Sequence, residues 1–222
     1  MISCQDLKFS YPGESFDLRV KSLAVEKGES VALVGPSGCG KTTLLNLIAG
    51  ILLPGEGSVE VEDVRVNGMN LTQRQAFRLG NMGMVPQNFE LLDYLTVAEN
   101  ILTPIRLSGR GIVQSEHRER LAELAGRTGM SDLLQKFPTG LSQGERQRTA
   151  LCRGLVGNPA LILADEPTGN LDPGNQDRIV SLLLEEARRL EASVLMITHE
   201  PGLLGRFDRV VDLVELRKGA DS

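Results

Sequence analysis

Residues Gly35-Pro36-Ser37-Gly38-Cys39-Gly40-Lys41-Thr42 fit the pattern G-x-x-x-x-G-K-[ST], the most informative motif in this chain. In such a loop the backbone N–H groups surround phosphate oxygens, while the lysine reaches the terminal phosphates. Residues 29–34 before it read as a buried strand, and residues 42–49 after it as a helix whose N-terminus directs its free amides at the same anion. The motif requires this strand–loop–helix context. We therefore predict that the chain binds a nucleoside triphosphate.

Length and composition are those of an ordinary soluble globular protein. The chain has 222 residues, of which 41% are hydrophobic and 24% charged, enough for one large domain or two small ones. Its net charge of −5 argues against nucleic acid as the main partner, because nucleic-acid binding needs a broad basic surface. Arginines gather between Arg106 and Arg153, but the acidic residues among them favour a solvated helical face.

The sequence carries no sign of a membrane span or a secretion signal. Its apolar runs fall short of the roughly 20 residues that span a bilayer, and its first six residues lack the charged and apolar regions of a signal peptide. The cysteines, Cys4, Cys39 and Cys152, are odd in number and have no metal-like spacing, as expected in a reducing compartment. We expect a cytoplasmic protein.

The distribution of strand and helix patterns predicts an α/β core with a helical insertion. Residues 1–70 hold short alternating strands separated by Pro-Gly and Lys-Gly turns. Residues 88–157 have mostly helical patterns, including a helix over residues 114–125 with apolar residues on one face. The chain then returns to strand, helix and strand at 161–164, 179–190 and 194–197. The continuous apolar runs of these strands are typical of a buried parallel sheet, which favours one interrupted domain over two independent ones.

Two adjacent carboxylates, Asp165 and Glu166, follow the apolar run Leu161-Ile162-Leu163-Ala164. An aspartate at the carboxyl end of such a strand holds Mg²⁺ in phosphate-loop NTPases, and a neighbouring glutamate can orient and deprotonate an attacking water. Acidic pairs often end strands at the surface without any function. The phosphate loop upstream makes the catalytic interpretation the better one.

Ser142-Gln143-Gly144-Glu145 opens an amphipathic helix that runs to about Leu155. The pattern is a capping box, which by itself accounts for Ser142 and Glu145. It does not account for Gly144 in the first turn, where glycine costs about 1 kcal/mol relative to alanine. A glycine there would let a phosphate approach the helix N-terminus closely. A cap and an anion site can therefore coexist at this position.

Four single residues can be interpreted from their chemistry alone, and for two of them, His199 and Tyr11, more than one interpretation is possible. His199 follows the last buried strand, at the edge where the other motifs converge, which favours a functional role over a surface histidine. Tyr11 could stack on a base or be a half-buried turn aromatic. Gln87 is an ordinary turn residue by its surroundings, and Asp172 is explained as a helix N-cap before a proline.

The order of these motifs resembles that of the nucleotide-binding subunits of ABC transporters, and the resemblance covers nearly the whole chain. Tyr11 looks like the A-loop aromatic that stacks on adenine, and residues 35–42 look like the Walker A loop. Gln87 matches the Q-loop glutamine, which links metal and water to the transporter-facing surface. Leu141-Ser142-Gln143-Gly144-Glu145 matches the signature motif that is specific to this family.

The remaining motifs complete the same order along the chain. Asp165 resembles the Walker B aspartate and Glu166 its catalytic glutamate, while Asp172 resembles the D-loop aspartate and His199 the switch histidine. The resemblance implies an ABC-type ATPase that uses ATP and Mg²⁺. Its catalytic residues would be Glu166, His199, Gln87, Lys41 and Asp165. Its metal ligands would be Thr42, Gln87 and Asp165. Its nucleotide contacts would be Tyr11, Gly35, Pro36, Ser37, Gly38, Cys39, Gly40, Lys41, Thr42, Thr43, Ser142, Gln143, Gly144, Glu145 and Asp172.

The resemblance also implies the architecture of the ABC ATPase fold. That fold is a P-loop NTPase core with a mostly parallel sheet, an N-terminal antiparallel β subdomain and an inserted α-helical subdomain. Residues 1–222 would form a single domain. Residues 1–87 and 158–222 would make up the catalytic core with the β subdomain, and residues 88–157 the helical signature subdomain.

Within the family, Ala164-Asp165-Glu166-Pro167-Thr168-Gly169-Asn170-Leu171-Asp172 resembles the lipoprotein-release, macrolide-export and cell-division branch. The resemblance implies a nucleotide-dependent homodimer in which each phosphate loop faces the signature helix of the other copy. It also implies an integral-membrane transporter subunit, contacted near residues 87–100, which would keep the chain on the inner face of the cell membrane. The alternative is a non-transport ABC ATPase acting on DNA or ribosomes. Such proteins usually have long coiled coils, zinc-binding cysteines or tandem cassettes, and the sequence has none of these patterns.

Two positions depart from the family pattern. Gln143 stands where the signature usually has glycine, but Ser142 and Gly144 remain, which favours retained contact with ATP. Cys39 occupies a loop position where serine or alanine is more usual. Amides at the helix terminus could activate its thiol and make the loop sensitive to oxidation. Alternatively, the cysteine is a small filler residue.

Overall fold

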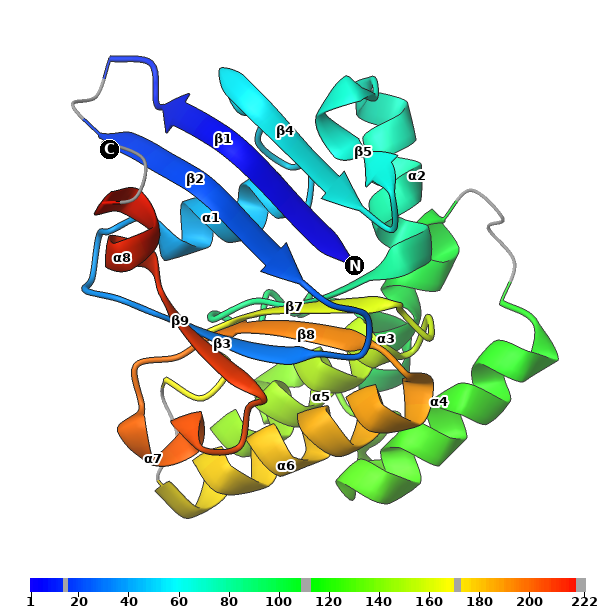
Figure 1. The fold of residues 1–222 in the computed structure, drawn as a ribbon. Coiled ribbons are helices and arrows are strands. Elements are labelled where there is room, and N and C mark those ends of the chain that lie inside the picture. Colours follow the sequence, from blue (N-terminus) through cyan, green and yellow to red (C-terminus); the bar gives the residue numbers. More distant parts are fainter. Residues whose placement is uncertain (14–15, 109–112, 170–172, 219–222) are drawn as a thin grey trace.

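The architecture is that of two stacked sheets with a helix between them (Figure 1), in a computed structural model that describes residues 1–13, 16–108, 113–169 and 173–218. The antiparallel sheet has the strand order β2-β1-β4-β5. Its strands are β1 (Ile2–Ser10), β2 (Asp17–Val25), β4 (Glu56–Val61) and β5 (Val64–Arg65). The core sheet has the order β6-β7-β8-β3-β9, and all its pairs are parallel. Its strands are β3 (Ser30–Val34), β6 (Met82–Val85), β7 (Leu161–Asp165), β8 (Ser193–Ile197) and β9 (Arg209–Asp212).

Helices cover both faces of the core sheet. Helix α1 (Lys41–Ile48) lies between the two sheets, while α5 (Gln143–Leu155) and α6 (Pro173–Leu190) pack on the opposite face (Figure 1). The chain reaches α5 through α3 (Val97–Leu107) and α4 (Ser115–Thr128), all three between β6 and β7. The other helical elements are α2 (Leu71–Asn81), α7 (Pro201–Leu204), α8 (Leu213–Lys218), η1 (Val66–Gly68), η2 (Ser131–Leu133) and η3 (Pro138–Gly140). The predicted α/β core with a helical insertion is confirmed, and the limits of the subdomains stay a prediction.

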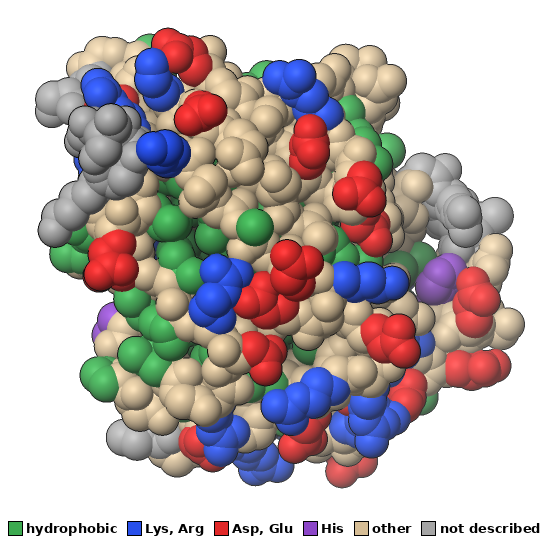
Figure 2. Space-filling model, viewed as in Figure 1, with side chains coloured by type: hydrophobic (Ala, Val, Ile, Leu, Met, Phe, Trp, Pro, Cys, Tyr) green, Lys and Arg blue, Asp and Glu red, His purple; other side chains and the backbone are tan. Residues whose placement is uncertain are grey.

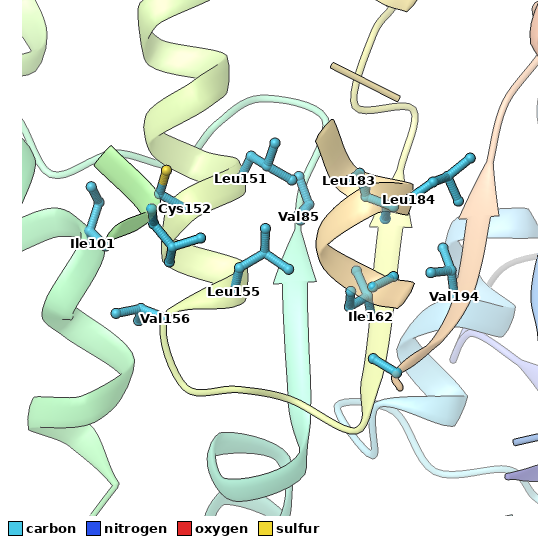
Figure 3. Close-up of a cluster of buried hydrophobic side chains, with 14 of the residues drawn as sticks. Val85, Ile101, Leu151, Cys152, Leu155, Val156, Ile162, Leu183, Leu184 and Val194 are labelled. Carbon is cyan, nitrogen blue, oxygen red and sulfur yellow. The ribbon is translucent and has the colours of Figure 1, made fainter. Parts of the chain in front are cut away.

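Alternate residues of each core strand face opposite layers. In β7, Leu161 and Leu163 belong to the cluster that includes α1, while Ile162 belongs to the cluster on the side of α5 and α6. Figure 3 shows Ile162 in that second cluster, with Leu183 of α6 and Val194 of β8. Because both faces of the sheet are buried at β3, β7 and β8, these strands are almost continuously apolar in sequence.

Two helices extend beyond the limits that their apolar patterns predict. The helix predicted from residue 179 begins earlier, at Pro173, because its first turn, Gly174-Asn175-Gln176-Asp177, has no apolar residue to reveal it. The helix predicted over residues 114–125 runs on to Thr128 and ends where Gly129 adopts a left-handed conformation, with φ 67°. This is the usual way for glycine to end a helix.

The expectation of a solvated arginine face is wrong at two positions of α4. Arg120 and Arg127 bind the carboxylate of Glu186 in α6, at 3.0 and 2.6 Å, and Glu186 is only 3% exposed. These ion pairs tie α4 to α6. Figure 2 shows positive and negative side chains interspersed over the visible face of the molecule. No helix within the described ranges is both long and apolar enough to cross a membrane.

Candidate active site

The loop between β3 and α1 is shaped by its glycines and by its lysine. Gly40, the N-cap of α1, has φ 106°, and a Cβ there would lie 2.9 Å from the ring of Phe16. Only glycine combines this conformation with so close an approach. The Lys41 Nζ donates to the carbonyl oxygens of Gly35 and Pro36 at 2.8 and 3.0 Å, which holds the ammonium group within the loop.

A cavity of about 390 Å³ opens beside this loop. Its lining residues are Tyr11, Phe16, Ser37, Gly38, Gly40, Lys41, Thr42, Thr43, Gln87 and Glu166. The rings of Tyr11 and Phe16 lie 5.8 Å apart, and the Tyr11 hydroxyl bonds Thr43 Oγ1 at 3.3 Å. Lys41 and Glu166 supply charge to the same cavity. Aromatic rings, a glycine-rich loop and charged groups in one cavity suit the base and the triphosphate of a nucleotide.

Phe16 is a candidate site residue that the sequence motifs do not identify. It precedes β2 and belongs to no motif. The only available signal is compositional, since the chain has six Phe, two Tyr and no Trp, and Phe9, Tyr11 and Phe16 lie between positions 9 and 16. The ring of Phe9 meets that of Tyr11 edge-on at 4.8 Å, so the three aromatics form one group.

The predicted acidic pair lies at the carboxyl end of β7 and meets residues from three other segments. The Thr42 hydroxyl forms a hydrogen bond with Asp165. The Glu166 Oε2 accepts a hydrogen bond from Gln87 Nε2 at 3.3 Å and lies 3.3 Å from His199 Nδ1. Residues far apart in the sequence thus converge at one edge of the core sheet, as Gln87 and His199 do on Glu166.

Burial and backbone strain mark this acidic pair. Burial raises the pKa of the Asp165 carboxyl, and the nearby charge of Glu166 adds to the rise, which the Thr42 hydrogen bond only partly opposes. A cation beside such a carboxyl would stabilise its charged form. Glu166 has φ 43°, in the left-handed region that non-glycine residues rarely adopt. Outliers of this kind cluster at functional sites.

The side chains around Asp165 fit Mg²⁺ that is bound together with a nucleotide. Thr42, Asp165 and Gln87 offer a hydroxyl, a carboxylate and an amide oxygen, the hard ligands that Mg²⁺ prefers. Within the described part of the chain, no group of three or more His, Cys, Asp or Glu could hold a metal. A site with so few protein ligands is typical of Mg²⁺ bound through one or two carboxylates and the phosphates of a substrate.

The predicted signature residues 142–145 lie at the N-terminus of α5 and do not line this cavity. The Ser142 Oγ accepts from the Glu145 N–H at 3.4 Å, and Glu145 Oε2 accepts from the Ser142 N–H at 2.7 Å, so the capping box is confirmed. The hydrogen bonds from Ser142 lower the pKa of Glu145. Ser142 and Gln143 are exposed, and none of the described residues 142–145 lines the cavity. Among the described atoms, a Cβ at Gly144 would meet only Arg148 Nη1, at 3.6 Å.

Two predicted nucleotide contacts have a different outcome. Cys39 is 8% exposed and belongs to the apolar cluster around α1, and its Sγ fills the space beside Gly35. This packing favours the filler interpretation over a redox role, because thiol oxidation follows exposure and thiolate character. The predicted D-loop residue, Asp172, lies outside the described residues.

An arginine in α8 binds the backbone of the phosphate loop. Arg217 in α8 donates to the carbonyl oxygens of Cys39 at 3.2 Å and of Asp17 at 2.9 Å. Helix α8 begins at Leu213, where the Asp212 carboxylate accepts from the Val214 N–H at 2.8 Å. The helix therefore joins the loop to β2, a connection that no motif in the sequence predicts.

Comparison with known protein sequences agrees with this arrangement. A family model described as ABC transporter matches residues 18–169. An uncharacterised ABC transporter ATP-binding protein of Mycobacterium tuberculosis is 45% identical over 193 residues, which cover 85% of this chain and 75% of that protein. The lipoprotein-releasing system ATP-binding protein LolD of Gluconobacter oxydans is 43% identical over 201 residues, which cover 90% of this chain and 83% of that protein.

Solved structures give the same result for the fold. A dimeric bacterial ABC transporter cassette superposes with a TM-score of 0.86 at 31% identity, covering 96% of this chain and 94% of that one. A dimeric cassette in a post-hydrolysis state, bound to ADP and phosphate, matches with the same TM-score of 0.86 at 30% identity.

Proposed function

The chain belongs to the ABC transporter family, and on that premise we propose that it hydrolyses ATP to drive a membrane-embedded partner in the manner of lipoprotein release. It is an ATP-binding subunit with ATPase activity. One observation carries the proposal: Gln87, Glu166 and His199 converge beside the phosphate-loop cavity, while none of the signature residues 142–145 of the same chain lines it.

Different residues of the cavity would hold the two ends of the nucleotide. Tyr11 and Phe16 would hold the base, because their rings provide an apolar surface for it. The loop amides and Lys41 would hold the β- and γ-phosphates, and Thr43 would fix Tyr11 through their hydrogen bond.

The end of β7 that carries Asp165 and Glu166, the acidic edge, would supply the chemistry of hydrolysis. Thr42, Asp165 and Gln87 would hold Mg²⁺, which when bound neutralises the charge of the phosphates. Glu166 would accept a proton from water as the water oxygen attacks the γ-phosphorus and the bond to the β-phosphate oxygen breaks, leaving ADP and phosphate. His199, 3.3 Å from Glu166 Oε2, would donate to the γ-phosphate and steady it.

A second copy of the chain would complete the site. Ser142 and Gly144 stand at the N-terminus of α5, where free amides and the helix dipole favour an anion. Ser142 and Gln143 are exposed there, which suits contact with a nucleotide held by another copy. The dimeric state of the similar cassettes supports this arrangement.

A second cavity, of about 400 Å³, suits contact with the membrane partner. It begins beside the predicted contact region, at Pro86 and Glu90, and extends along α3 to Pro104 and Leu107. Its other lining residues include Ile51, Leu79, Met84, Thr42 and Asp165. We assign this cavity to an apolar cytoplasmic segment of the partner, which would reach the metal-holding residues directly. Such contact would keep the chain at the inner face of the cell membrane.

The names of the relatives favour the transport assignment. The similar LolD protein is named for lipoprotein release, and we extend that task to this chain as a proposal. The alternative, an ABC ATPase acting on DNA or ribosomes, is not favoured, because the similar proteins reported above are named as transporter subunits or cassettes.

Co-purification from detergent-solubilised membranes tests this function. We expect a multi-span membrane protein to be recovered with the chain, and Leu107→Asp to lose it while keeping ATPase activity in solution. Leu71→Asp is the matched control, because Leu71 is 61% exposed and Leu107 64%, yet only Leu107 lines the cavity. Unchanged recovery with Leu107→Asp would contradict the docking site. Recovery of ribosomes or DNA instead of a membrane protein would contradict the transport assignment.

A further inference from the structure

The turn that carries Gln87 has an unusual backbone. Residues 86–96 contain no glycine, yet Phe89 and Glu90 have φ of 59° and 50°. Both lie in the left-handed region, which a side chain disfavours. The Glu90 N–H also bonds the Asn88 carbonyl oxygen at 2.6 Å. A backbone of this kind persists only where its surroundings hold it.

The side chain of Arg153, in the last turn of α5, holds both of these residues. Its Nη1 donates to the Glu90 carbonyl oxygen at 2.6 Å, and its Nη2 donates to the Phe89 carbonyl oxygen at 2.5 Å. A guanidinium suits this task because its planar fork donates two hydrogen bonds at once. Burial lowers the pKa of the Arg153 guanidinium, so these carbonyl contacts compensate a desolvated charge.

Arg153 is itself fixed by the close packing of α5 on β6. A Cβ at Gly83 would collide with the carbonyl oxygen of Gly154, and a Cβ at Gly154 would lie 2.9 Å from Val85 Cγ2. The two glycines therefore allow the helix and the strand to pack backbone against backbone. Figure 3 shows Leu155 of the same helix beside Val85 in the buried cluster.

We infer that Arg153 is a positioning residue for ATP hydrolysis, which fixes the turn after β6 so that Gln87 stays beside Glu166. The Gln87 Nε2 lies 3.3 Å from Glu166 Oε2, and the two residues that Arg153 holds, Phe89 and Glu90, are two and three positions after Gln87 in the chain. Helix α5 carries Gly144 in its first turn and Arg153 in its last, so it joins the signature end to the turn of Gln87. The inference rests on the proposed function, which assigns Gln87 to the metal and the attacking water.

The variants Arg153→Ala and Arg153→Lys test this in steady-state ATPase assays of the full chain. We expect Arg153→Ala to lower kcat about tenfold, with the KM for ATP changed less than about threefold, because the phosphate loop is untouched. The Mg²⁺ concentration for half-maximal activity should rise with it. Arg153→Lys keeps the charge but not the fork, and its kcat should fall about threefold.

Arg74→Ala is the matched control. Arg74 also donates to two carbonyl oxygens, those of Gly50 at 3.0 Å and Met69 at 2.8 Å, but neither residue adjoins the acidic edge. Its kcat should stay within about twofold of the parent chain. In a Gln87→Ala background, adding Arg153→Ala should change kcat less than about twofold, because residues that act through each other are not additive.

The outcomes separate the inference from the proposed function. A kcat for the Arg153 variants equal to that of Arg74→Ala would overturn the inference. The inference would also be overturned if Arg153→Ala lowered kcat as much in the Gln87→Ala background as in the parent chain. A normal kcat for Gln87→Ala alone would contradict the proposed role of Gln87 and the inference with it. If thermal unfolding shows that Arg153→Ala does not fold, Arg153→Lys carries the same test.

Discussion

The phosphate-loop edge and the signature end of α5 differ in how their carboxylates are held. At the loop edge, burial raises the pKa of Asp165, and Glu166 has a strained backbone. At the signature end, Ser142 and Glu145 satisfy each other, and the pKa of Glu145 is lowered. A cation beside Asp165 would therefore stabilise the ionised carboxyl of the first region. The carboxylate of the second region is already held by hydrogen bonds within the chain, and Ser142 and Gln143 beside it are exposed.

The largest expected effect comes from removing the proton acceptor at the loop edge. Glu166→Gln should lower kcat at least about 100-fold, because an amide cannot accept the proton of the attacking water. ATP affinity, measured by titration calorimetry, should stay within about threefold of the parent chain. Light scattering should then show an ATP-bound dimer that persists. Turnover at the parent rate would contradict the role of Glu166.

A smaller effect should follow from removing the contact between Arg217 and the backbone of the phosphate loop. Arg217→Ala removes the donor that links the Cys39 carbonyl to β2, and should raise the KM for ATP about threefold or more with little change in kcat. Arg209→Ala is the control, because Arg209 binds Glu29 and the Ala24 carbonyl oxygen away from the loop. Equal KM values for the two variants would show that α8 does not position the loop.

The smallest expected effect is a gain in stability at the loop edge. Because its pKa is raised in the folded chain, ionised Asp165 destabilises the fold. The protonated carboxyl of Asp165 contributes its full stabilisation below the ordinary pKa of 3.8. This stabilisation is lost as the pH rises through the pKa of Asp165 in the folded chain. Asp165→Asn should therefore raise the free energy of unfolding of the ligand-free chain by about 1 kcal/mol at pH 7. Denaturant titrations should show this gain shrink as the pH falls toward 3.8. A loss of stability at pH 7 would contradict the account.

The same two regions show what the sequence can and cannot predict. The loop, its flanking strand and helix, and the Ser142 cap were predictable, because each is encoded by neighbouring residues. Phe16 and Arg217 were not, since their contacts depend on how distant segments pack. The Asp172 prediction lies outside the described residues and stays a prediction.

Arg153 has a structural role that no sequence motif predicts. In the sequence it is one of several arginines in a helical segment, where a solvated face is the natural expectation. In the structure it is bound to two carbonyl oxygens of a strained turn. No local pattern predicts such a turn. Left-handed conformations are usually predicted from a glycine, and this turn has none.

We propose that one nucleotide site needs the phosphate loop of one copy and the signature end of another, and mixing two inactive variants tests this. Lys41→Ala should lose nucleotide binding. Gly144→Asp should fold normally, because its Cβ has space in the chain, but it would repel the triphosphate held by the other copy.

Neither variant alone should hydrolyse ATP. An equal mixture of the two should recover about one quarter of the parent activity, because half of the random dimers pair an intact loop with an intact signature end at one of two sites. A mixture that stays as inactive as its components would contradict the account.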